Sequence, residues 1–106
     1  MSLKEVFAGL QEKINNDPSK MAGVSATYQF CLSGEGGGDY NVVFTDGAGK
    51  INEGMADNPD ITINMEAADY VDMVDGKLDA MSAFMTGKLK VEGDMSLAMR
   101  LQALLG

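Results

Sequence analysis

The sequence predicts an α+β protein, because helical and strand patterns occupy different parts of the chain. Near the N-terminus, apolar residues recur at helical spacing. They then alternate with polar residues through short segments that glycine-containing or proline-containing turns separate. From residue 67 the helical pattern returns, interrupted by one alternating segment. We expect a single domain over residues 1–106, because a chain of 106 residues is too short for two.

The first element is expected to be an amphipathic helix over residues 2–14. Ser2 is placed to cap it, and Glu5, three residues later, is the capping-box partner. The stretch from Asn15 to Pro18 ends the helix, and a short turn over 19–22 follows. One apolar face is expected to pack on the core, formed by Leu3, Val6, Phe7, Leu10 and Ile14.

Four strands are expected next. The clearest covers 24–32, where five apolar residues alternate with polar ones. A glycine-rich loop at 34–38 leads into a strand over 40–44, a weaker strand follows at 50–55, and another covers 61–65. Since each has one apolar face, we expect sequential antiparallel strands.

The remainder is expected to be mostly helical. One helix covers 67–74, and a short helix capped by Asp79 ends at Gly87. Residues 88–92 alternate and predict a final strand. Asp94 is then expected to cap a last helix over 95–105.

Composition excludes several classes of function. The net charge of −8 opposes the cationic patch that nucleic acid binding needs, so no nucleic acid partner is expected. Brief membrane contact through a local apolar patch stays open. The apolar runs are too short to span a membrane, and the N-terminus does not have the pattern of a secretory signal, so we expect a cytoplasmic protein.

The sequence offers little for catalysis. It has no histidine, and its single cysteine, Cys31, lies on a predicted strand. The glycine loop at 34–38 leads into a strand rather than a helix N-terminus, so it is a hairpin loop rather than a phosphate cradle. We therefore expect no enzymatic activity, no metal and no cofactor.

Methionine is the unusual feature. Seven of the nine methionines follow residue 54. On the last helix Leu97, Leu101 and Leu104 form a core face, while a second face consists of Met95, Met99 and Gln102. Another chain, a membrane surface or a bound apolar molecule would have to cover that second face. Composition alone does not choose among these.

The C-terminal half resembles the sterol carrier protein 2 lipid-binding domain family, most specifically in SAFMTGKLKVEGDMSLAMRLQ at 82–102. The resemblance implies a five-stranded, mainly antiparallel sheet covered on one face by about five helices, with an apolar tunnel between them. It implies a non-catalytic carrier of a fatty acid, a fatty acyl-CoA, a sterol or a similar lipid. The alternative is a protein-interaction subunit whose last helix docks on a partner enzyme or, as a weak homodimer, on a second copy.

Periodicity and the layout of the family together predict the residues of the site. The sheet is expected to supply a floor of Phe30, Phe44 and Ile63. The helices are expected to supply a lipid-facing wall, with Gln102 as a polar contact near its mouth: Val71, Val74, Met81, Phe84, Met85, Met95 and Met99.

Overall fold

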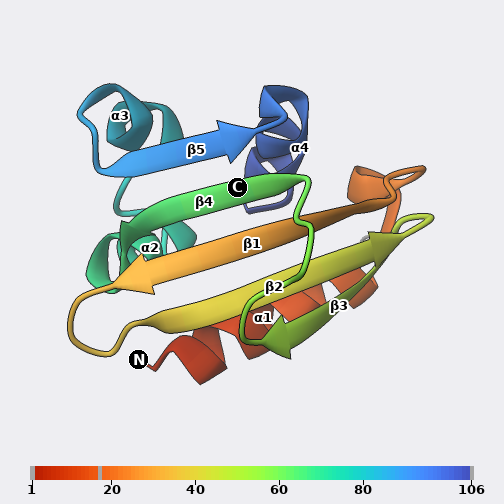
Figure 1. Ribbon diagram of the computed structural model, residues 1–106, viewed down its shortest axis with the longest axis horizontal. Coiled ribbons are helices and arrows are strands. Elements are labelled where there is room, and N and C mark those ends of the chain that lie inside the picture. The colour runs from red at the N-terminus through yellow and green to blue at the C-terminus, as the bar shows by residue number, and fades with distance from the viewer. Residues whose placement is uncertain (1, 17, 106) are drawn as a thin grey trace.

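The structure of the protein is a computed structural model that describes residues 2–16 and 18–105, with side chains described except at 18, 20 and 102–105. It confirms the predicted α+β class, since a five-stranded sheet has its helices on one face (Figure 1). The elements in chain order are α1 (Leu3–Asn16), the 3₁₀ helix η1 (Pro18–Met21), β1 (Ala26–Ser33), β2 (Gly38–Thr45), β3 (Ala48–Glu53), β4 (Ile61–Glu66), α2 (Ala67–Val74), α3 (Ala80–Met85), β5 (Leu89–Gly93) and α4 (Met95–Leu105).

The strand order is β3-β2-β1-β4-β5, and three of the four neighbouring pairs are antiparallel. The expectation that β4 continues the antiparallel run is wrong, because β4 lies parallel to β1, with Ile63 beside Phe30. To reach this position the chain crosses three strand spacings of about 4.8 Å each. The seven residues between β3 and β4 can span that distance, at about 3.3 Å per residue.

This crossover, residues 54–60, passes over the face of the sheet opposite the helices (Figure 1). Gln29 of β1 lies beneath it and is fully buried. Its side-chain oxygen accepts a hydrogen bond from the Ala56 amide at 2.7 Å, and its nitrogen donates to the Gly54 carbonyl at 3.2 Å. Asp60 exchanges two further bonds with the Thr27 backbone, so the crossover is fixed at both ends.

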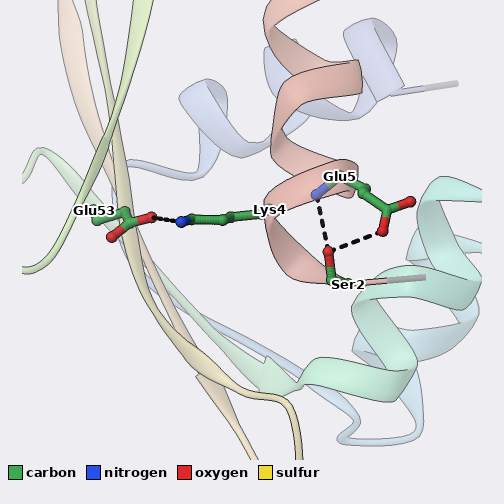
Figure 2. Close-up of polar contacts among 4 residues, drawn as sticks. All are labelled: Ser2, Lys4, Glu5 and Glu53. Atoms are coloured by element: carbon green, nitrogen blue, oxygen red, sulfur yellow. Dashed lines mark hydrogen bonds and ion pairs between the residues drawn. The ribbon is translucent and has the colours of Figure 1, made fainter.

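α1 begins with the expected capping residues. The Glu5 amide donates to Ser2 Oγ at 3.3 Å, and the Ser2 hydroxyl donates to Glu5 Oε1 at 3.2 Å (Figure 2). In the standard capping box that carboxylate accepts from the backbone amide instead. Lys4 forms an ion pair with Glu53 at 3.9 Å, but both side chains are exposed, so it adds little stability.

The main core lies between α1, α2 and the β1–β2 part of the sheet. All five predicted α1 core residues are buried. The Phe7 ring stacks on Tyr40 at 4.2 Å and on Tyr70 at 5.3 Å, while Phe30 meets both Phe7 and Tyr70 edge-on. These aromatic contacts fill the space beneath β1 and β2. The β4–β5 side is contacted by α2, α3 and α4.

Among the described residues the structure has four α-helices and the single 3₁₀ turn of η1, against about five helices expected. The number of α-helices is therefore lower than expected, and η1 lies where only a short turn was predicted. Within the described part of the chain, no helix is both long and apolar enough to cross a membrane.

Candidate functional site

An apolar pocket of about 200 Å³ lies under the β4–β5 side of the sheet, where α2, α3 and α4 meet it. Every side chain that lines it is apolar, so the pocket walls offer an organic ligand dispersion contacts and no charge. The lining residues are Ile63, Met73, Ala80, Met81, Phe84, Leu89, Val91, Met95, Ala98, Met99 and Leu101.

Alternating side chains of β5 form part of the pocket wall on the sheet side. Leu89 and Val91 face the pocket, whereas Lys88 and Lys90 lie on the other side of the strand, where they line a separate polar groove. Val91 pairs with Ile63 of β4 in the antiparallel register, so two neighbouring strands supply adjacent apolar side chains.

Two helices form the opposite wall. Met95, Ala98 and Met99 recur at helical spacing and place one face of α4 on the pocket. α3 starts where Asp79 Oδ2 accepts from the Ser82 amide at 3.0 Å, which orients the helix that carries Met81 and Phe84. Asp94 caps the N-terminal end of α4 in the same way, because its Oδ1 accepts a hydrogen bond from the Ser96 amide at 2.9 Å.

The pocket opens to solvent through these helices. Four of its large helical side chains, Met81, Phe84, Met95 and Met99, are between 44% and 67% exposed. Burial of such side chains is favourable, and a cluster of them on a monomer marks a surface that binds something. Met85 also lies on α3 but is 79% exposed and does not line the pocket.

The structure brings five of the eleven residues predicted for the site to the pocket: Ile63, Met81, Phe84, Met95 and Met99. Val71 and Val74 are partly buried and pack against the main core instead. Phe30 and Phe44 belong to that core as well, where Phe44 meets the Tyr28 ring at 5.4 Å. The side chain of Gln102 falls outside the described residues.

Phe30 and Phe44 lie outside the pocket because of the strands that carry them. Phe30 and Phe44 lie on the helix-covered face of the sheet, as expected, but on β1 and β2. These strands pack against α1 and α2, whereas the pocket lies under β4 and β5, which come after β1 in the strand order. Alternation predicts the face of a sheet and not the position of a strand within it.

Six pocket residues were not predicted from the sequence: Met73, Ala80, Leu89, Val91, Ala98 and Leu101. Leu89 and Val91 could have been found, because they alternate with Lys88 and Lys90 in the predicted last strand. Ala80 and Ala98 are small side chains that leave space rather than fill it. Leu101 was assigned to the core, and it is buried while also forming part of the pocket.

The structure describes one free thiol, Cys31 of β1, which does not line the pocket. Burial, with Asp39 nearby, raises the pKa of the Cys31 thiol, which keeps it in its unreactive protonated form at neutral pH. No cluster of three His, Cys, Asp or Glu side chains in the described ranges is placed to hold a metal ion. The last helix is tied to the sheet by the Tyr28 hydroxyl, which donates to the Leu97 carbonyl at 2.7 Å.

Comparison with known proteins agrees with this architecture. The family model described as the SCP-2 sterol transfer family matches residues 7–106. The chain belongs to the SCP-2 sterol transfer family. The solution structure of the sterol carrier protein domain 2 of Helicoverpa armigera is 33% identical, with a TM-score of 0.78, and the match covers 96% of this chain and 83% of that one.

Two further SCP-2 family comparisons define the context. The palmitated SCP2L2 of Aedes aegypti superposes with a TM-score of 0.83 over 99% of this chain and 95% of that one, at 21% identity, which shows the shared fold. Hydroxysteroid dehydrogenase-like protein 2 of Xenopus tropicalis is 35% identical over 98% of this chain. The chain spans only 25% of the length of that relative.

Proposed function

We propose that this chain is a non-catalytic lipid-binding domain that holds a fatty acid, a fatty acyl-CoA, a sterol or a similar lipid. The observation that carries the proposal is the open pocket under β4 and β5, whose walls are entirely apolar. An acyl chain in the pocket would remove those side chains from water, at about 25 cal/mol for each Å² of apolar surface. Membership of the SCP-2 family supports the same function.

The pocket also predicts how a fatty acid binds. Its lining contains no charged residue, so a carboxylate inside it would lose its hydration without a compensating partner. The acyl chain therefore enters first and the carboxylate stays at the mouth. Because apolar walls distinguish chains that differ by one methylene only weakly, by about 1–3 kcal/mol, the domain is expected to accept several lipids.

Thermal unfolding with palmitate tests the proposal, and the palmitated Aedes aegypti relative makes palmitate a natural probe. A ligand at a hundred times its dissociation constant stabilises the folded state by about 2.7 kcal/mol. For a domain of this size, that corresponds to a rise in Tm of roughly 10 °C. An unchanged Tm at saturating palmitate would contradict lipid binding.

A pocket-filling variant with a matched control sharpens this test. Ala98 lines the pocket on α4, and Ala8 is exposed on α1. Ala98→Leu should occupy the space of the ligand, so the Tm rise caused by palmitate should be largely lost. Ala8→Leu should keep the full rise. If both variants respond to palmitate like the wild type, the lipid does not bind in this pocket.

A second candidate function is docking of the pocket rim on a partner enzyme or on a second copy of the chain. The half-exposed methionines favour it, as does the greater length of the dehydrogenase-like relatives. Native mass spectrometry separates the two functions. Lipid that co-purifies at nearly one molecule per chain supports the lipid-carrier function, whereas a stable dimer without lipid supports the docking function.

A further inference from the structure

Tyr70 of α2 has a hydroxyl group whose hydrogen-bonding capacity is unused. Its side chain is fully buried, and its oxygen is the buried side-chain polar atom in the described residues that has no hydrogen-bond partner. An unpaired buried hydroxyl destabilises a fold, and phenylalanine would fill the same space without that cost. The Tyr70 hydroxyl can therefore accept a partner that a ligand brings.

The neighbours of the Tyr70 ring connect it to the pocket wall. The ring stacks on Phe7 and meets Phe30 edge-on at 5.5 Å. Phe30 lies beside Ile63 in the parallel β1–β4 register, and Ile63 lines the pocket. Met73, three residues after Tyr70 on α2, lines it as well. Tyr70 is thus linked to the pocket wall through Phe30 and through its own helix.

The pocket is small for a long-chain lipid. Pockets for organic ligands usually measure about 300–1,000 Å³, whereas this one measures about 200 Å³. A long-chain lipid enclosed by it would have to widen it. Met73 is the wall residue suited to that movement, because an unbranched thioether repacks easily. Widening the pocket beside Met73 and Ile63 brings the inner end of a ligand toward Tyr70.

The chemistry of the Tyr70 hydroxyl determines which ligand atoms it can bind. A tyrosine hydroxyl both donates and accepts a hydrogen bond. Burial raises the pKa of Tyr70, so the hydroxyl stays neutral at physiological pH. Neither the pocket lining nor the aromatic rings around Tyr70 supply a cation, so a carboxylate is excluded from this position.

We propose that the Tyr70 hydroxyl binds the single uncharged oxygen of a long-chain lipid, such as a fatty alcohol, held with its oxygen inward. This inference rests on the proposed lipid-binding function and makes that function more specific. It gives the domain two binding orientations, with neutral oxygenated lipids entering oxygen first and fatty acids entering chain first. Tyr70 is then the residue that distinguishes the two classes.

The test compares three ligands of equal chain length on wild type and Tyr70→Phe: 1-dodecanol, dodecanoate and 1-chlorododecane. Dissociation constants come from displacement of a fluorescent fatty acid analogue. We expect the variant to bind 1-dodecanol roughly tenfold more weakly, the effect of losing one hydrogen bond. The other two ligands should stay within about twofold. Tyr40→Phe, whose ring also stacks on Phe7, is the matched control and should leave all three dissociation constants unchanged.

The outcomes separate this inference from the proposed function. If wild type binds all three ligands and Tyr70→Phe weakens them equally or not at all, the role of Tyr70 is overturned while lipid binding stands. If the wild type binds none of the three ligands, both the role of Tyr70 and the proposed lipid-binding function are contradicted. The Tm of ligand-free Tyr70→Phe should equal or exceed that of wild type, because the substitution removes only an unpaired hydroxyl. A lower Tm would show that this hydroxyl already has a partner and would also overturn the inference.

Discussion

At the scale of single residues, Tyr28 and Gln29 show what a polar atom contributes when it is buried. They are neighbours on β1 and point to opposite faces of the sheet. The Tyr28 hydroxyl binds the Leu97 carbonyl and holds α4 against the helix-covered face. Gln29 binds the crossover on the other face. Each links β1 to a segment that is distant in sequence, and each would leave a buried group unpaired if replaced.

Tyr28→Phe should lower stability at neutral pH and lower it less at alkaline pH. Burial raises the pKa of Tyr28 to about 12, an effect that nearby Arg100 opposes, from about 10 in the unfolded chain. Its contribution is therefore complete below pH 10 and is lost as the pH rises toward 12. Urea unfolding should show a deficit of about 1 kcal/mol at pH 7, from the lost hydrogen bond. A deficit that stays constant up to pH 11.5 would argue against this linkage.

At the scale of elements, the short helix α3 depends on the capping residue just before it, Asp79. Six residues are too few for a stable isolated helix. Asp79 supports it by accepting from both the amide and the hydroxyl of Ser82, at 3.0 and 3.2 Å. Because α3 carries Met81 and Phe84, the order of this helix determines one wall of the pocket.

Asp79→Ala should therefore weaken lipid binding without removing a single pocket residue. Loss of a helix cap costs about 1 kcal/mol, which corresponds to several-fold in the dissociation constant for palmitate if α3 must be ordered to bind it. Asp79→Asn is the control, since asparagine caps helices as well as aspartate does. Equal losses in the two variants, measured by displacement of a fluorescent fatty acid, would attribute the effect to charge rather than to the cap.

The elements were largely predictable from the sequence, because each has a local pattern of its own. The buried face of α1 and the cap at Asp79 are both set by nearby residues. The parallel direction of β4 was not predictable, since alternation carries no information about the neighbour of a strand. Gln29 was assigned to the polar side of its strand for the same reason, and only the crossover makes that position buried.

At the scale of the whole molecule, the two ends of the sheet differ in how they are closed. The β1–β2 side is filled by the aromatic residues of the main core, whereas the β4–β5 side is covered by two helices with half-exposed apolar side chains. This division explains why only part of the predicted set lines the pocket. The apolar faces of α3 and α4 indicated Met81, Phe84, Met95 and Met99, whereas placing Phe30 and Phe44 required knowledge of which strands lie under which helices.

The same division predicts a distinctive pattern of methionine oxidation. Met81 and Met95 line the pocket, whereas Met55 lies on the crossover of the opposite face and is 62% exposed. Peroxide converts exposed methionines to sulfoxides at rates that follow their accessibility. Palmitate should therefore slow oxidation at Met81 and Met95 several-fold and leave Met55 unchanged, as peptide mass spectrometry can measure. Met55 serves as an internal control for any scavenging of peroxide by the lipid. Equal protection at all three positions would indicate that palmitate does not bind on the β4–β5 side.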